Sequence, residues 1–129
     1  MKGAAAVGPE KALFGAVVLC LLLQPWVILR LEINWDEFFY LSQLYDYQRG
    51  EMAKALQSLH VHLLGWVTAL PGNEIDQIIA GRFVMLACLA GTCGLIYALS
   101  REFFSRVASA MAVLAFASAG PTLIHGASF

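Results

Sequence analysis

Two neighbouring carboxylates, Asp36 and Glu37, are the residues best suited to chemistry, and they lie in the segment Asn34-Trp35-Asp36-Glu37. A carboxylate held in place can act as a general base toward a hydroxyl group or bind a divalent metal ion. Glu37 also has a structural explanation, because Asn followed three residues later by Glu is a capping box at a helix start. Capping does not require Asp36. The spacing therefore favours a capping role for Glu37 and leaves Asp36 as the first candidate for catalysis.

Arg82 and two histidines are weaker candidates. The guanidinium of Arg82 could pair with a substrate phosphate, although extension of the side chain toward a membrane surface is the favoured explanation. His60 and His62 lie two positions apart, which on a helix separates them by about 200°. They are therefore not expected to bind one metal ion together.

The composition predicts a membrane protein. The chain has 129 residues, of which 60% are hydrophobic and 13% are charged, whereas soluble domains carry about 25% charged residues. Long runs contain no charge at all, which indicates that the lipid bilayer is the main solvent. The formal net charge of -1 argues neither for nor against a charged partner. The absence of a basic patch in the sequence argues against nucleic-acid binding.

Three apolar runs predict transmembrane helices at about 12–31, 80–99 and 107–124. The first run is long enough to cross about 30 Å of hydrocarbon. A cleaved signal peptide is the alternative for this run, but cleavage needs small residues after the apolar core. None occurs between Ala16 and Ser42, so we interpret the run as an uncleaved signal anchor.

The second run carries small residues four positions apart, as at Ala87 and Gly91 and at Ala90 and Gly94. Such spacing lets helix backbones approach closely in lipid. We therefore expect this helix to pack against other helices.

The loop at about 32–78 has a different character from the apolar runs that flank it. Residues 32–82 hold seven acids and three bases. Two groups of apolar residues recur at steps of three and four, which predicts two amphipathic helices with a break at Arg49-Gly50. The first group is Phe38, Leu41, Leu44 and Tyr45, and the second is Met52, Leu56, Leu59, Leu63, Trp66, Val67 and Leu70. Amphipathic helices between membrane spans are expected to lie in the interface. The predicted fold is an all-α membrane protein with about three transmembrane helices and two interfacial amphipathic helices in the first external loop.

Basic residues predict the orientation. Lys2 and Lys11 precede the first span, and Arg101 and Arg106 lie between the second and third spans. Because two spans separate these pairs, both pairs fit on the cytoplasmic side under the positive-inside rule. We expect a cytoplasmic N-terminus and a periplasmic loop, in a bacterial inner membrane.

The segment Asn-Trp-Asp-Glu-Phe-Phe-Tyr after a signal anchor resembles the N-terminal part of the polyprenyl-phosphate-dependent glycosyltransferases of the GT-C superfamily. These include the protein O-mannosyltransferases and the lipid A aminoarabinose transferases. The segment Ala80-Gly-Arg-Phe-Val-Met-Leu, followed by Leu95-Ile-Tyr-Ala-Leu-Ser-Arg-Glu-Phe-Phe and the Ala-rich third span, looks like the second and third helices of the same superfamily. The resemblance covers the chain from about Leu13 onward.

The resemblance implies an inverting transfer of a sugar from a polyprenyl-phosphate donor to an acceptor on the non-cytoplasmic face. Asp36 matches the acidic residue of the first external loop that acts as catalytic base or helps to place a metal, and Glu37 is the second choice. Arg82 is the weaker candidate for the donor phosphate. No cofactor is certain, and a divalent metal ion stays an open alternative. The expected partners are the bilayer, the lipid-linked donor and the remaining spans of a full-length enzyme.

GT-C enzymes are much longer than this chain and usually carry a second acidic external loop. We therefore expect the chain to be an N-terminal portion that is inactive alone. The alternative is a non-catalytic small membrane protein or a degenerate remnant. A transporter fragment ranks last, because transporters usually carry polar or broken helices at the bilayer midplane and the second and third spans show no charge there.

Overall fold

The computed structural model describes residues 8–51 and 58–129, and throughout these ranges every regular element is helical. The elements are α1 (Pro9–Arg30), α2 (Trp35–Arg49), α3 (Ser58–Leu64), the 3-10 helix η1 (Gly65–Ala69), α4 (Glu74–Arg101), α5 (Arg106–Ala117) and α6 (Gly120–His125). The predicted all-α class is confirmed.

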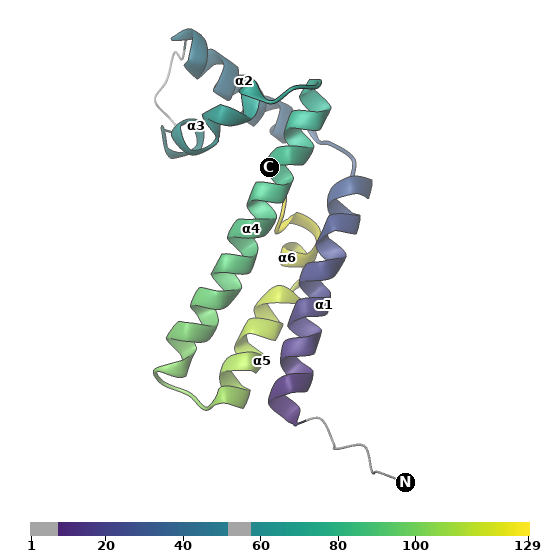
Figure 1. Ribbon diagram of the computed structural model, residues 1–129, viewed down its shortest axis with the longest axis vertical. Helices are drawn as coiled ribbons and strands as arrows, with labels where there is room; N and C mark the ends of the chain where they lie inside the picture. Colours follow the sequence, from purple (N-terminus) through teal and green to yellow (C-terminus); the bar gives the residue numbers. More distant parts are fainter. Residues whose placement is uncertain (1–7, 52–57) are drawn as a thin grey trace.

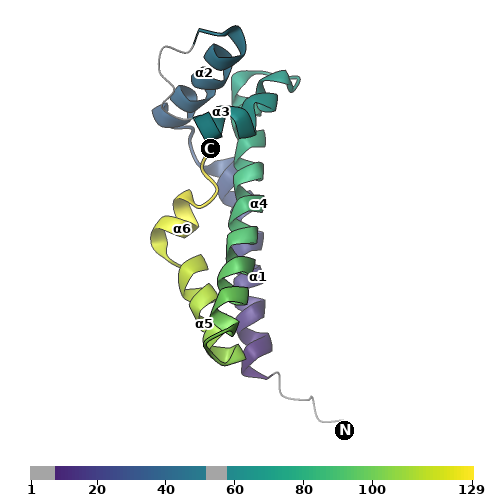
Figure 2. The same cartoon turned by 90° about the vertical axis from the view of Figure 1, so that its left-hand side faces the viewer.

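The helices form a long bundle with a helical cap at one end. Helices α1, α4 and α5 run side by side, and each contacts the other two (Figure 1). The cap consists of α2, α3 and η1, and it lies at the end where α1 finishes and α4 begins; the second view shows the same arrangement (Figure 2). The chain end approaches this cap from below. The segment that carries the candidate acids therefore covers one end of the bundle.

Helices α1 and α4 are long and apolar enough to cross a membrane. Their 22 and 28 residues correspond to about 33 and 42 Å. The outer faces of α1 and α4 carry exposed apolar side chains, such as Leu22 (68% exposed) and Leu95 (72% exposed). The core helix of a soluble protein would bury such side chains, so these faces are suited to lipid.

The third predicted span, 107–124, is not one continuous helix. Helix α5 ends at Ala117 after 12 residues, and α6 begins at Gly120 with Pro121 in its first turn. Proline lacks the N–H that would bond the carbonyl of Ala117 four residues earlier, and its ring clashes with that carbonyl, so α5 cannot continue through Pro121. At about 18 Å, α5 alone is shorter than the hydrocarbon core. Within the described residues, two helices meet the requirements of a span and the third predicted span does not.

The cap follows the predicted pattern of two helices with a break between them. Gly50 ends α2 with a left-handed φ of 72°, a conformation that glycine adopts without steric cost. This confirms the predicted break at Arg49-Gly50. The second predicted helix is present as α3 and η1, while Met52 and Leu56 lie outside the described residues, as does Lys2.

Two apolar clusters hold the molecule together. One joins the cap to α4 and to the end of the chain, and its buried members are Leu41, Leu44, Val61, Leu64, Val67, Ile78 and Phe129. The other joins α1, α4 and α5 through Val17, Cys93, Val113 and Ala117. The cap is therefore packed onto the bundle rather than attached only by the chain.

The small residues of α4 lie outside both clusters. Ala87, Ala90, Gly91 and Gly94 are exposed, and a Cβ atom added at Gly91 or Gly94 would meet nothing within 4 Å. Their packing against further helices stays a prediction.

Candidate functional site

Helix α2 begins with the predicted capping box. The Glu37 amide donates to Asn34 Oδ1 at 3.0 Å, and the Asn34 amide donates to Glu37 Oε2 at 3.2 Å. Both bonds satisfy backbone N–H groups that have no partner within the helix. The capping role of Glu37 is confirmed.

Glu37 also forms a buried ion pair with Arg82 of α4, which the sequence did not predict. Arg82 donates from Nε to Glu37 Oε1 at 2.8 Å and from Nη2 to Glu37 Oε2 at 2.6 Å. Both side chains are only 1% exposed. This is the two-pronged geometry in which arginine binds a carboxylate most strongly.

The rest of the Arg82 guanidinium binds the end of α1. Nη1 donates to the carbonyl oxygens of Ile28 and Leu31 at 2.8 and 2.9 Å, and Nη2 donates to that of Glu32 at 3.1 Å. Carbonyl groups at a helix C-terminus lack helical partners. Since arginine has five N–H donors, these bonds and the two to Glu37 use all of them. Arg82 therefore links α1, α2 and α4.

The Glu37 carboxylate also uses all of its hydrogen-bond acceptor positions. Oε1 accepts from Arg82 and from the Phe129 amide at 3.1 Å, while Oε2 accepts from Arg82 and from the Asn34 amide. Burial raises the pKa of Glu37, but the hydrogen bonds from Arg82, Phe129 and Asn34 and the Arg82 charge outweigh it, so the pKa lies below its usual value. A carboxylate has about four acceptor positions. Glu37 is an ionised structural group with no free position for a substrate proton or a metal.

Asp36 lies next to this ion pair in sequence but faces away from it. Its side chain is exposed, because successive residues on a helix point about 100° apart. The residue before it, Trp35, is 82% exposed. Of the three predicted site residues, the structure brings Glu37 and Arg82 together and leaves Asp36 accessible.

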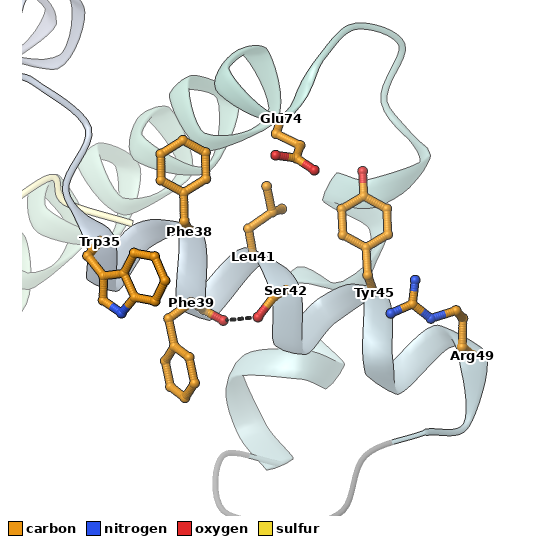
Figure 3. A pocket seen from close by; sticks show the side chains of 8 residues that line it. All are labelled: Trp35, Phe38, Phe39, Leu41, Ser42, Tyr45, Arg49 and Glu74. Carbon is orange, nitrogen blue, oxygen red and sulfur yellow. Dashed lines mark hydrogen bonds between the residues drawn. The ribbon is translucent and has the colours of Figure 1, made fainter.

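An open aromatic groove of about 630 Å³ runs along α2 beside the start of α4 (Figure 3). We define the aromatic groove by its lining residues, which are Trp35, Phe38, Phe39, Leu41, Ser42, Tyr45, Arg49 and Glu74. Arg49 binds Asp46 at 2.6 Å and Glu51 at 2.8 Å, so its charge is already balanced by two acids. Asp36 is not among the lining residues.

The two histidines of α3 have separate environments, as their spacing predicted. His62 Nδ1 lies 2.8 Å from the Tyr47 hydroxyl. His60 packs against the rings of Tyr40 and Phe129, with centroids at 5.3 and 5.5 Å. Burial lowers the pKa of His60, although a backbone hydrogen bond at Tyr40 acts in the opposite direction. Within the described residues, no three His, Cys, Asp or Glu side chains form a group that could hold a metal ion.

Sequence reasoning missed one participant, Phe129. Its amide bonds Glu37 and its ring, 8% exposed, packs under His60 and against Gly81. A residue 92 positions from Glu37 has no spacing pattern that would connect the two. The only related feature of the sequence is Gly81, whose lack of a side chain leaves space for the Phe129 ring.

No family model, curated protein or solved structure matches the chain.

Proposed function

We propose that the chain is an integral membrane protein whose cap lies at the non-cytoplasmic interface. Lys11 near the start of α1 and the α4–α5 turn with Arg101 and Arg106 are at the same end of the bundle, and the cap is at the other (Figure 1). This arrangement supports the orientation expected from the positive-inside rule. In a bacterial cell, the membrane would be the inner membrane and the cap would be periplasmic.

Aromatic side chains mark the proposed boundary of the hydrocarbon. Near the end of α1, the Arg30 guanidinium lies 4.8 Å from the ring centroid of Trp26. Trp35 begins α2, and Trp66 lies in η1 of the same cap. Tryptophan is enriched at the headgroup level of membranes, which supports placing the cap there.

We propose further that the chain is the N-terminal portion of a membrane glycosyltransferase that uses a polyprenyl-phosphate sugar donor. The observation that carries this proposal is the division of roles between adjacent acids. Glu37 is fully bonded inside the protein, whereas Asp36 is exposed at the start of a helix that Glu37 and Arg82 hold in place. A general base must be accessible and held near its substrate. Asp36 is exposed, and the helix start that carries it is fixed by the Glu37–Arg82 pair and the capping box.

In the proposed reaction, the Asp36 carboxylate takes the proton of an acceptor hydroxyl group. The hydroxyl oxygen forms a bond to the anomeric carbon of the sugar, and the bond from that carbon to the donor phosphate oxygen breaks. The polyprenyl phosphate leaves with the electron pair. A lipid-linked donor holds its phosphate at the headgroup level, where the cap would lie.

The test compares Asp36→Asn with Glu32→Gln in native membranes that contain the full-length gene product. Both acids are exposed and lie four residues apart, and only the backbone of Glu32 is used in the ion-pair network. Transfer of radiolabelled sugar from a polyprenyl-phosphate donor should fall at least about 100-fold in Asp36→Asn and stay near the wild-type rate in Glu32→Gln. Full activity in Asp36→Asn would remove Asp36 from the mechanism.

A non-catalytic membrane protein is the second candidate. The complete internal bonding of Glu37 and Arg82 favours it, since two of the three predicted site residues are committed to the fold. Wild-type membranes that contain the folded full-length gene product and show no transfer above a strain lacking it would support this candidate over the transferase.

A further inference from the structure

Two residues of α2 and the first residue of α4 line two adjoining hollows. Phe38, Tyr45 and Glu74 line both the aromatic groove and a second hollow of about 570 Å³ next to the turn at Gly72-Asn73. Phe38 and Tyr45 are seven residues apart, or about two helical turns, and so share one face of α2. Figure 3 shows both rings pointing toward the start of α4, with Glu74 reaching between them above Leu41.

Hydrogen bonds hold the Tyr45 wall of this site in place. The Tyr45 hydroxyl donates to Gln77 Oε1 at 2.5 Å, and the Gln77 amide donates to the Leu70 carbonyl at 3.2 Å. Gln77 is 3% exposed and Leu41 at the floor is 2% exposed. Rigid aromatic walls lose little conformational entropy when a ligand enters.

The charge of the site is negative. Within residues 8–51 and 58–129, the Glu74 side chain makes no hydrogen bond or ion pair, whereas neighbouring Asp76 is used in a capping box with Asn73. The cation of the groove, Arg49, is already bound by two acids. A ligand that complements this site therefore carries a positive charge.

We propose that the aromatic groove binds the ammonium group of a phospholipid headgroup, with Phe38, Tyr45 and Glu74 as its contacts. Aromatic ring faces attract ammonium groups through their quadrupole, and the Glu74 carboxylate supplies the opposite charge. The site requires one compact cation and offers no second free cation, among the described lining residues, for an anionic headgroup such as glycerol phosphate.

The position of the groove identifies a lipid as the source of the ammonium group. Only residues 31–34 separate the end of the membrane-length helix α1 from α2. The groove rim carries Trp35 and Phe39, which are 82% and 50% exposed, and such aromatic side chains favour the headgroup level. At that depth, headgroups are far more concentrated than any soluble amine. This binding is independent of sugar transfer and of Asp36.

The experiment counts lipids that stay bound to the protein. The protein is placed in nanodiscs with equal amounts of palmitoyl-oleoyl phosphatidylcholine, phosphatidylethanolamine and phosphatidylglycerol, and released lipid complexes are measured by native mass spectrometry. We expect both ammonium lipids to be enriched about fivefold over phosphatidylglycerol. Glu74→Gln and Phe38→Leu should abolish the enrichment, and Tyr45→Phe, which keeps the ring, should retain it.

Two control variants remove similar groups elsewhere. Glu32→Gln removes an exposed acid outside the groove, and Phe104→Ala removes a 61% exposed ring in the α4–α5 turn; both should keep the enrichment. Circular dichroism establishes that each variant is folded. Equal retention of all three lipids by the wild type, or unchanged enrichment in Glu74→Gln, would overturn the proposal. Binding of tetramethylammonium chloride to lipid-free protein without lipid enrichment would overturn the lipid source.

Discussion

At the scale of single residues, two adjacent acids have opposite environments. Glu37 points into the protein, where four donor groups surround it, and Asp36 points out into open space. Burying a carboxylate and a guanidinium is costly unless the pair is close and the remaining positions are bonded. Here every donor of Arg82 and every acceptor position of Glu37 is used, so the pair can be both buried and charged.

The buried pair makes stability depend on pH in the acid range. The pKa of Glu37 is lower in the folded protein than its usual value, so its contribution is complete above the unfolded pKa of about 4.3 and is lost as pH falls through the folded pKa. We expect the gap in melting temperature between wild type and Glu37→Gln to be constant from pH 7 to about pH 5 and to shrink below about pH 4.

The measurement is a set of thermal unfolding curves in detergent micelles, followed by circular dichroism. The Glu37→Gln variant cannot titrate at this position, so the difference between the two proteins isolates Glu37 from the other acids. A gap that widens as the solution becomes more acidic would contradict the ion-pair assignment.

At the scale of elements, Gly81 and Phe129 connect α4 to the end of the chain. A Cβ atom at position 81 would overlap the Phe129 ring, which also packs against the His60 ring. Helix α4 therefore needs glycine at this turn so that the chain end can reach Glu37. The contact is a packing requirement and not a matter of backbone conformation.

Gly81→Ala should destabilise the protein by about 1–3 kcal/mol, as overpacking of a filled site does. Gly91→Ala on the same helix is the matched control, since a Cβ there meets nothing within 4 Å, and we expect it to be neutral or slightly stabilising. Unfolding in mixed micelles with increasing sodium dodecyl sulfate measures both changes.

The Phe129→Ala background provides the second half of this test. With the ring removed, Gly81→Ala should lose most of its cost, because the two residues are coupled by direct contact. An equal cost with and without the ring would show that Gly81 is required for another reason.

The elements show which parts of the fold a sequence can predict. Capping residues act on backbone groups three positions away, so the box at Asn34 and Glu37 and the break at Gly50 were predictable from spacing. The third span was predicted from its apolar composition, which carries no information on the helix break that Pro121 brings. The Glu37–Arg82 and Phe129 contacts depend on how α1, α2 and α4 pack, and no periodicity in a single sequence encodes that packing.

At the scale of the whole molecule, the two ends of the bundle differ in charge. Arg101 and Arg106 lie in the turn at one end, and the acidic cap lies at the other. The two membrane-length helices connect these ends and expose apolar side chains between them. The proposed orientation in the bilayer follows from this asymmetry.

Cysteine labelling tests the orientation. In a background where Cys20, Cys88 and Cys93 are replaced by Ala, Ser42→Cys in the cap should react with a membrane-impermeant maleimide on intact spheroplasts. Phe104→Cys in the α4–α5 turn should react only after the membrane is permeabilised. Both positions are exposed in the folded protein, so a lack of labelling cannot result from burial inside the protein. The reverse labelling pattern would therefore contradict the proposed orientation.

The central claim is that Glu37 holds the structure while Asp36 is free for another role. Thermal unfolding of Asp36→Asn and Glu37→Gln in the same micelles tests it most directly, because both changes replace a carboxylate by an amide at adjacent positions. We expect Glu37→Gln to lose about 3–5 kcal/mol, as broken buried ion pairs do, and Asp36→Asn to stay within about 0.5 kcal/mol of wild type. Equal losses in the two variants, or a larger loss in Asp36→Asn, would contradict the account.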